Sequence, residues 1–200
     1  MRLRITRAAC ATLASAALLA GCGAGEEQQH NAVAQGGTFQ FHSPGGQLEI
    51  FYPEEERAPI GELEGESLTE DGERLKLSDF DGQVVVLNVW GQWCAPCRTE
   101  VDDLQRVHDE ISERGGTVLG INVRDHNKQL AQDFAADNWV DYPSIYDPPF
   151  RNAAALGGVP TSVVPTTIVL DKQHRPAAVF LREITDEDVL KVTDELLGES

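Results

Sequence analysis

Two cysteines separated by two residues, Cys94 and Cys97, are the side chains in this sequence best suited to covalent chemistry. They follow an apolar run, 84–90, that is typical of a buried strand, and they precede a segment, 98–114, that we expect to be helical. A C-x-x-C pair between a strand and a helix places its first thiol over the helix N-terminus, where unpaired backbone N–H groups favour the thiolate. The second cysteine lies one turn further along. The pair is therefore expected to switch between dithiol and disulfide.

Three other uses of such a pair fit the sequence less well. A structural disulfide that closes a loop of two intervening residues constrains the unfolded chain little. A zinc site needs four ligands, and no second C-x-x-C or histidine pair completes the set, so we expect no metal. Covalent haem attachment requires a histidine directly after the second cysteine, where this chain has Arg98.

The N-terminus, residues 1–21, is expected to be a lipoprotein signal peptide. Arginines precede an apolar stretch, 8–20, that is too short to span a bilayer stably. The Leu-Ala-Gly-Cys sequence that ends at Cys22 resembles the bacterial lipobox, which predicts that Cys22 carries a lipid and becomes the mature first residue. An ordinary secretory signal is the alternative. If Cys22 is acylated, Cys94 and Cys97 are the free thiols of the exported protein.

The composition is acidic, with a formal net charge of −17. Basic patches of the kind that bind nucleic acid are absent from the sequence, so we expect no nucleic-acid partner. Residues 22–37 are rich in glycine and glutamine without apolar periodicity, and we expect them to form a flexible tether. The remainder, 38–200, is expected to be a single domain without internal repeats.

The elements that must position the cysteines alternate between strands and helices. Two short alternating segments, 38–41 and 48–52, are separated by a Pro-Gly-Gly turn and predict a β-hairpin within an N-terminal extension, 38–60. Leu130 and Phe134, four residues apart, predict the apolar face of a helix. Further strands are expected at 74–77, 117–123, 142–146, 166–170 and 176–181, and helices at 129–138, at 150–156 and from residue 185. This order predicts an α/β fold with three layers around a mixed sheet.

Together these features resemble the thioredoxin-like superfamily, and within it the membrane-anchored TlpA/ResA-type thiol-disulfide oxidoreductases. The resemblance is carried by Trp-Cys-x-Pro-Cys at 93–97 and by Val-Pro-Thr-Thr before a strand at 164–167, and it runs from about residue 75 to the C-terminus. The segment 38–52 looks like that of the actinobacterial lipoprotein variants of the family. The resemblance implies a thioredoxin-like three-layer α/β/α fold with a central mixed sheet, and it implies that no cofactor is needed.

The resemblance also assigns roles around the disulfide. Cys94 is expected to be the nucleophile and the more exposed thiol, and Cys97 is expected to be the resolving thiol that frees the partner. Pro165 matches the family's cis-proline, so the backbone of Val164 before it is expected to face the disulfide and to bind substrate. An ordinary strand start is the alternative for this proline. Trp93 matches an exposed tryptophan beside the nucleophile.

A carboxylate and an amide complete the expected site. Glu100, three residues after Cys97, matches a family glutamate near the active site. It is expected to accept or relay the proton of Cys97, with a glutamate on the helix surface as the alternative. Asn88 stands where thioredoxin carries a buried aspartate that takes part in proton transfer, and an asparagine is not able to act as a general base.

We therefore expect an enzyme, a thiol-disulfide oxidoreductase that is lipid-anchored at Cys22 on the extracytoplasmic face of the bacterial cell membrane. Its expected partners are protein thiols and disulfides, with apocytochrome c as the substrate that the resemblance favours, and a membrane electron-carrier protein. Two alternatives stay open at this point. One is an oxidant that forms disulfides in secreted proteins, and the other is a non-catalytic lipoprotein that binds a partner through a thioredoxin fold.

Overall fold

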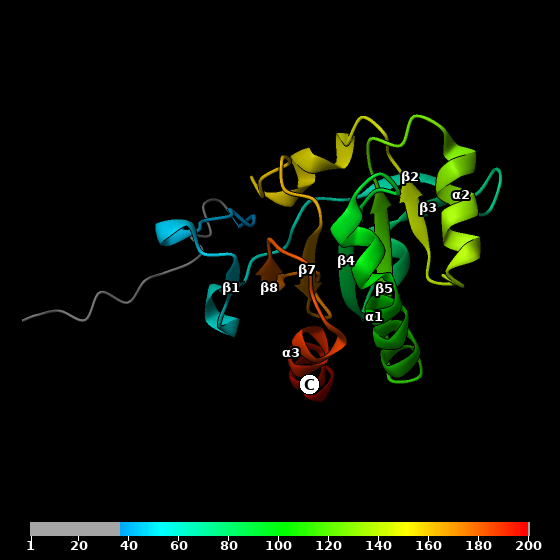
Figure 1. The fold of residues 1–200 in the computed structure, drawn as a ribbon. Coiled ribbons are helices and arrows are strands. Elements are labelled where there is room, and N and C mark those ends of the chain that lie inside the picture. The colour runs from blue at the N-terminus through cyan, green and yellow to red at the C-terminus, as the bar shows by residue number, and fades with distance from the viewer. Residues whose placement is uncertain (1–36, 200) are drawn as a thin grey trace, which may run out of the picture.

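The computed structural model describes residues 37–199. Its centre is an eight-stranded sheet with the strand order β1-β8-β7-β4-β5-β6-β2-β3 (Figure 1). The central strand β4 (Val84–Trp90) is buried at every residue, as its continuous apolar sequence predicts. It pairs in parallel with β5 (Gly116–Asn122) and antiparallel with β7 (Thr166–Leu170). The prediction of a mixed sheet is therefore confirmed.

The outer strands extend the sheet on both sides of this centre. On one side, β8 (Pro176–Phe180) pairs antiparallel with β7. On the other side, β6 (Ser144–Tyr146) runs parallel to β5. Next come β2 (Glu64–Ser67) and β3 (Arg74–Lys76), which are antiparallel to β6 and to each other, respectively. β3 is therefore the last strand on the side of the sheet that lies beyond β5.

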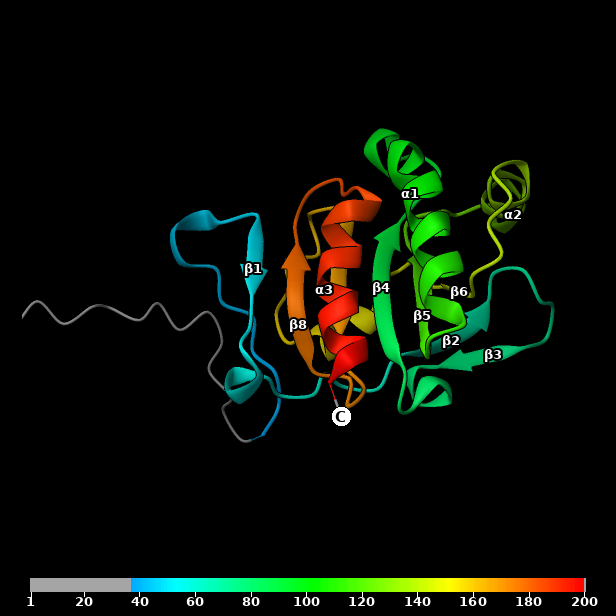
Figure 2. The ribbon, with the colours of Figure 1, turned by 90° about the horizontal axis from the view of Figure 1, so that it is seen from below.

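Two long helices lie side by side on one face of the sheet (Figure 2). They are α1 (Ala95–Ser112), which starts at the cysteine pair, and α3 (Asp186–Gly198). The side chain of Thr185 caps α3 by accepting a hydrogen bond from the backbone N–H of Asp188, and the Asp188 carboxylate bonds back to the Thr185 N–H. This reciprocal capping box fixes where the helix begins, as the sequence predicts.

A shorter helix, α2 (Lys128–Asp137), lies on the same face, where Phe134 packs against Trp90 with ring centroids 5.7 Å apart. The expectation that Leu130 shares an apolar face with Phe134 is wrong, because Leu130 is 50% exposed. The buried residues of this helix are Ala131, next to Leu130, and Ala135. A small side chain lets the helix backbone approach the core closely, and this contact turns Leu130 toward solvent.

The opposite face of the sheet is covered by the 3-10 helix η4 (Arg151–Leu156) and by the N-terminal segment, which together form the third layer. Side chains of β4 alternate between the two faces. Val85 and Leu87 point to this side, where they join a core that includes Phe39 and Leu63. The third layer is therefore largely non-α-helical.

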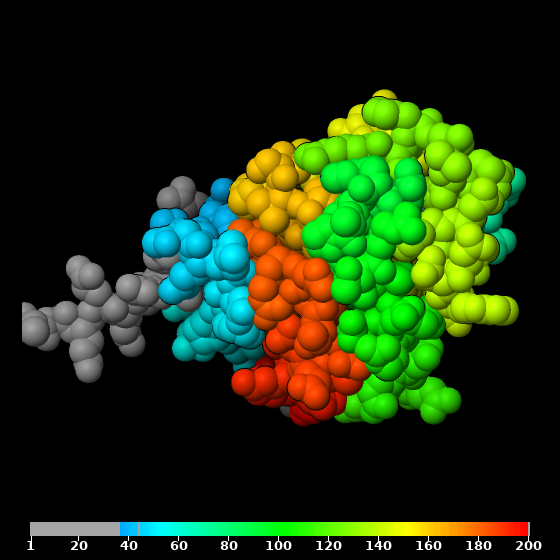
Figure 3. Space-filling model, viewed as in Figure 1, coloured from blue at the N-terminus to red at the C-terminus, as the bar shows by residue number. Residues whose placement is uncertain are grey.

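The expected N-terminal hairpin is wrong. β1 (Glu49–Phe51) does not pair with the segment before it but adds antiparallel to β8, far along the chain. The earlier segment is held elsewhere, with the N–H of Phe39 donating to the carbonyl of Pro59 at 3.0 Å. Phe39 and Ile50 are both buried. The position of each segment is therefore set by where its apolar side chain packs in the core, and not by pairing between the two segments. Figure 3 shows the cyan N-terminal part lying directly against the orange C-terminal part.

Within residues 37–199, no helix has the length and apolar character needed to cross a membrane. The predicted signal peptide at 1–21 and the lipidation site at Cys22 lie outside the described residues, as does the predicted tether at 22–37 apart from its last residue. These three assignments stay predictions.

Candidate active site

The two cysteines lie at the start of α1 and are joined by a disulfide, with their sulfurs 2.16 Å and their Cα atoms 5.3 Å apart. Cys94 is the N-cap residue of the helix. Its Sγ accepts a hydrogen bond from the backbone N–H of Cys97 at 3.2 Å. The positive end of the helix dipole therefore lies beneath Cys94 Sγ, where both the dipole and this N–H favour a thiolate. The predicted order of strand, cysteine pair and helix is confirmed.

Both cysteines are buried while they are joined. The exposed fraction is 4% for Cys94 and 3% for Cys97, so the expectation of a clearly more exposed Cys94 is wrong for the disulfide form. The reason is the loop that lies over the sulfur, because the carbonyl oxygen of Val164 is 3.6 Å from Cys94 Sγ. The chain neighbours Trp93 and Ala95 are exposed, so the rim around Cys94 is open to another protein.

The peptide bond between Val164 and Pro165 is cis, as predicted. Pro165 directly precedes β7, and the first residue of β7, Thr166, is paired with Val89 near the end of β4. This antiparallel pairing brings the loop before β7 to the end of β4 from which the cysteine pair follows. The backbone N–H of Val164 makes no hydrogen bond within residues 37–199. It therefore has an unused donor beside the disulfide.

Trp93 lies on the rim, as its sequence position predicts, and is 44% exposed. Its indole nitrogen donates to the carbonyl of Val123 at 3.0 Å, which ties the ring to the segment that follows β5. Gly91 makes this arrangement possible, because a Cβ at that position would lie 2.3 Å from the indole nitrogen. The ring is therefore fixed in orientation at the rim, where it stays partly exposed.

Glu100 is completely buried, so the alternative of a surface glutamate is wrong. One carboxylate oxygen accepts from the side-chain amide of Asn88 at 2.9 Å, and the other accepts from the backbone N–H of Ile184 at 3.0 Å. Burial raises the pKa of the Glu100 carboxyl to about 7, although these two hydrogen bonds act in the opposite direction. The carboxyl is therefore able to gain or lose a proton near neutral pH.

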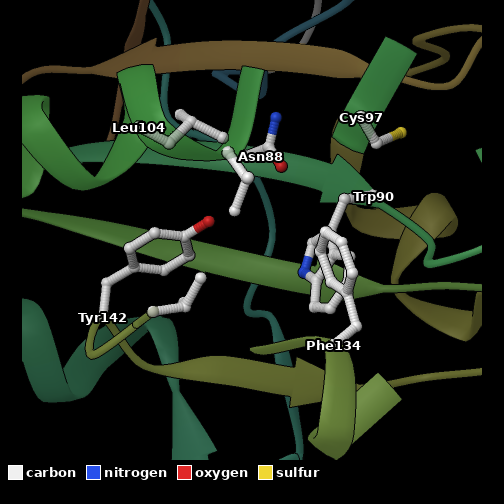
Figure 4. Close-up of a pocket in the computed structure, with 8 residues that line it drawn as sticks. Asn88, Trp90, Cys97, Leu104, Phe134 and Tyr142 are labelled. Atoms are coloured by element: carbon white, nitrogen blue, oxygen red, sulfur yellow. The ribbon is translucent and has the colours of Figure 1, made fainter. Parts of the chain in front are cut away.

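A small cavity lies beside the Asn88 amide, between the sheet and helices α1 and α2 (Figure 4). Its volume of about 10 Å³ admits about one water molecule. Asn88 Oδ1 and Trp90 Nε1 are buried and have no hydrogen-bond partner within the described part of the chain. Figure 4 shows the hydroxyl of Tyr142 on the facing side. The lining residues are Asn88, Trp90, Cys97, Val101, Leu104, Phe134, Val140 and Tyr142.

Sequence reasoning missed two parts of this surrounding. Trp90 ends β4 on the same face as Asn88, and the two-residue alternation of a strand is a signal that could have found it. Asp125 is buried and its carboxylate accepts from the backbone N–H of Gln92 at 2.9 Å and from the side chain of Asn122 at 2.7 Å. Asp125 thereby ties the loop before Cys94 to the end of β5. Nothing in the sequence pattern indicates this contact.

Comparison with known proteins agrees with this geometry. The sequence model of the AhpC/TSA family matches residues 55–175. A solved structure described as a secreted thiol-disulfide isomerase from Corynebacterium glutamicum is 65% identical to this chain, covers 82% of it and 100% of its own chain, and superposes with a TM-score of 0.80. A structure described as a DsbF homologue from Corynebacterium diphtheriae is 67% identical, covers 80% of this chain and 100% of its own, and has a TM-score of 0.77.

A more distant relative supports the same assignment. The thiol-disulfide oxidoreductase ResA of Geobacillus kaustophilus is 27% identical over 141 residues, which are 70% of this chain and 79% of that protein. The family match includes the strand, the cysteine pair, α1 and the cis-proline described above. The chain therefore belongs to the AhpC/TSA family and is a thiol-disulfide oxidoreductase with a thioredoxin-like fold.

Proposed function

We propose that this enzyme exchanges disulfides with other proteins outside the cytoplasm, with Cys94 as the nucleophile and Cys97 as the resolving thiol. The observation that carries the proposal is the position of Cys94 Sγ, which is 3.2 Å from the backbone nitrogen of Cys97 and 3.6 Å from the carbonyl oxygen of Val164. The first contact stabilises a thiolate. The second contact places the backbone of Val164 next to the reactive sulfur, where it is able to bind the backbone of a substrate.

In the reducing direction the reaction takes two exchange steps. The Cys94 thiolate attacks one sulfur of a substrate disulfide, forms a mixed disulfide and releases the other substrate sulfur as a thiolate. The Cys97 thiol then loses its proton and attacks Cys94 Sγ. This second attack releases the remaining substrate sulfur as a thiolate and leaves the Cys94–Cys97 disulfide. Two electrons pass from enzyme to substrate, and the reverse steps oxidise a substrate dithiol.

The rim is proposed to hold the substrate backbone while its sulfur reacts. Val164 offers an N–H that no residue of the described chain uses, and its carbonyl faces Cys94. An extended substrate segment is able to pair with this backbone as an added strand does. Trp93 is partly exposed next to Cys94, and its fixed orientation lets it contact the substrate without losing side-chain freedom.

Glu100 is proposed to accept the proton that Cys97 gives up. It follows Cys97 by one helical turn, is buried, and is hydrogen-bonded to Asn88. Asn88 and Cys97 both line the small cavity. A single water molecule in it is therefore able to bridge the Asn88 side-chain amide and Cys97. Asn88 acts in this scheme as a hydrogen-bond partner that orients the carboxylate.

Replacing Glu100 with glutamine is expected to slow the resolving step above about pH 7 and to flatten its pH dependence. The wild-type carboxyl has a pKa of about 7, so it is ionised above that pH and able to accept a proton, whereas below it the carboxyl is already protonated. The wild-type rate should therefore rise through this range. Glutamine never ionises, so we expect a loss on the order of 100-fold or more above the pKa and little difference below it.

Stopped-flow measurement of mixed-disulfide resolution over a range of pH values tests this expectation. Glu110→Gln is the matched control, because Glu110 lies on the same helix but is exposed and paired with Arg114. If the profiles of E100Q and wild type coincide, Glu100 is not the proton acceptor.

We also propose that the enzyme is held at the extracytoplasmic membrane face by a lipid on Cys22. Support comes from the Leu-Ala-Gly-Cys sequence after a short apolar stretch, and from the secreted C. glutamicum relative. Wild-type protein is expected to incorporate labelled palmitate in cells and a Cys22→Ser variant is not. Absence of label from the wild type, or equal labelling of the variant, would contradict the lipid anchor.

The direction of exchange has two candidates. The resemblance to ResA-type proteins implies reduction of apocytochrome c with electrons from a membrane carrier protein. Oxidation or isomerisation of secreted proteins is favoured by the relatives at 65% and 67% identity, which are described as a thiol-disulfide isomerase and a DsbF homologue. Equilibration with a glutathione redox buffer separates them, because a reduction potential above about −180 mV favours the oxidant and one below about −230 mV the reductant.

Catalytic turnover of insulin disulfides tests the proposal as a whole. The full chain is expected to accelerate the reduction of insulin by dithiothreitol, observed as precipitation of the freed chain. A non-catalytic lipoprotein with an inert disulfide would leave the rate at that of dithiothreitol alone, and this outcome would refute the proposed function.

A further inference from the structure

Seven of the thirteen lysines and arginines within residues 37–199 form ion pairs with carboxylates. Arg98 and Arg124 are among the six that do not, and both are exposed. They flank the cysteine pair, since Arg98 follows Cys97 directly and Arg124 lies over the ring of Trp93. The cations that do form ion pairs with carboxylates are Arg57, Arg74, Arg106, Arg114, Lys128, Arg175 and Arg182.

Arg124 is held in place by its own backbone and by two loops. Its φ of 59° lies in the left-handed region, which is uncommon for a residue with a side chain, and its N–H donates to the carbonyl of Pro148 at 3.0 Å. One guanidinium nitrogen donates to the carbonyl of Thr161 at 2.6 Å, and the guanidinium carbon is 5.7 Å from the centre of the Trp93 ring. Arg124 therefore spans from the tryptophan to the loop that leads to Val164, with further N–H donors unused.

Arg98 lies at the start of α1, directly after Cys97. Its backbone N–H donates to the carbonyl of Cys94 at 3.2 Å, which fixes it in the first turns of the helix. Its guanidinium carbon is 5.3 Å from the centre of the Phe134 ring, a geometry that favours a cation over the ring face. No hydrogen bond to the described residues uses its guanidinium group.

We propose that Arg98 and Arg124, here called the arginine rim, select polypeptides that carry a carboxylate side chain next to the cysteine that reacts with Cys94. This inference rests on the proposed function and adds the substrate class. A substrate whose sulfur reaches Cys94 and whose backbone follows Val164 has its flanking residues only about 3.5 Å further along the chain on either side. The planar guanidinium group matches a carboxylate with two parallel hydrogen bonds.

The net charge of the protein and the arginine rim predict opposite substrate preferences. With a formal charge of −17, the protein as a whole attracts cationic segments and repels anionic ones. The arginine rim predicts the opposite preference at the residues beside the reactive cysteine. At about 0.15 M salt the Debye length is near 8 Å, so distant charges are largely screened while direct contacts persist. The two effects are therefore separable by substrate and by salt.

The test measures how fast reduced full chain reacts with synthetic peptides whose single cysteine is activated as a disulfide with 2-thiopyridine. Attack by Cys94 at the peptide sulfur forms the mixed disulfide and releases 2-thiopyridone, which is followed by absorbance. The peptides differ only in glutamate, glutamine or lysine at the positions flanking the cysteine. We expect the glutamate peptide to react about fivefold faster than the glutamine peptide, since exposed charge contacts contribute modestly, and the lysine peptide to react slowest.

Variants of Arg124 test whether the rim causes the preference. In Arg124→Gln the ratio of the glutamate to the glutamine rate should fall toward one, and Arg124→Glu should favour the lysine peptide. Arg124→Lys should keep part of the preference, because the charge remains while the paired hydrogen bonds are lost. Arg151→Gln is the matched control, since Arg151 is also an exposed arginine without an ion pair in the described chain but lies in η4, away from the disulfide.

Two failures are distinguishable. Equal rates for the three peptides with wild-type enzyme, or the same preference in Arg124→Glu as in wild type, would overturn the arginine rim while leaving the proposed function in place. If thiopyridone release by wild type is no faster than by Cys94→Ser with any peptide, the proposed function itself fails.

Discussion

An enzyme with Cys94 replaced by serine is expected to lose disulfide exchange by a factor on the order of 10³ or more. A serine hydroxyl stays protonated at neutral pH, so the N–H of Cys97 and the helix dipole have no anion to stabilise. Cys97 is not expected to substitute, because it is buried and the contact with Val164 belongs to Cys94. The insulin assay measures the loss directly.

Two further measurements separate this chemistry from a change in fold. Ser112→Ala, at the far end of α1, is the control and should keep wild-type turnover. Alkylation of the reduced wild type across pH should show one thiol that ionises below the ordinary cysteine pKa of about 8.5. Should both thiols titrate at that ordinary value, the role assigned to the helix N-terminus would be wrong.

Replacing Cys97 with alanine is expected to abolish turnover while leaving the first attack intact. Cys94 still captures a substrate sulfur, but no second thiol is present to release it, so the mixed disulfide accumulates. Cys97 is buried beside the small cavity, and truncation to alanine removes one sulfur atom from a wall of that cavity without breaking a side-chain hydrogen bond. We expect this variant to stay folded and to carry a covalent adduct.

Mass spectrometry under non-reducing conditions detects the adduct as the mass of the variant plus one substrate thiol. In cells that express the full chain, the same adduct identifies the protein substrate and decides between apocytochrome c and secreted proteins. The double variant with Cys94→Ser should form no adduct. Turnover by Cys97→Ala at the wild-type rate, with no adduct, would contradict the two-thiol mechanism.

The centre of the fold and of the site was predictable from local sequence. β4 is apolar at almost every position, so both of its faces must be covered, which places it in the middle of the sheet. The cysteine pair marks the end of β4, and the proline marks the start of a second buried strand, β7. The structure has a disulfide at the first position and a cis peptide bond at the second, as the sequence predicts. These features depend on residues close in sequence or on burial alone.

The burial of Glu100 was visible in principle. Cys97 and Leu104 are buried on α1, and Glu100 lies on the same stripe, three residues after the first and four before the second. A carboxylate on such a stripe needs hydrogen-bond partners, and its partners come from β4 and from the loop before α3. The stripe is readable from the sequence, whereas those distant partners are not.

Contacts between distant segments explain the remaining differences. The choice of β1 to pair with β8 rather than with its neighbour depends on a free sheet edge that forms only when the whole chain has folded. The placement of Arg124 over Trp93 depends on a left-handed residue and on a loop far along the chain. Neither periodicity nor motif spacing contains this information.

The pairing of β1 with β8 also affects how the molecule meets copies of itself. The AhpC/TSA match begins at residue 55, so β1 precedes the matched part of the chain. Through the register of Ile50 with Val179, it occupies the outer backbone N–H and C=O groups of β8. An uncovered β8 would offer those groups as a template for strands of other molecules and for aggregation. β1 is itself the edge of the sheet, and with three residues it presents a shorter row of unpaired groups to other molecules than the five-residue β8 would.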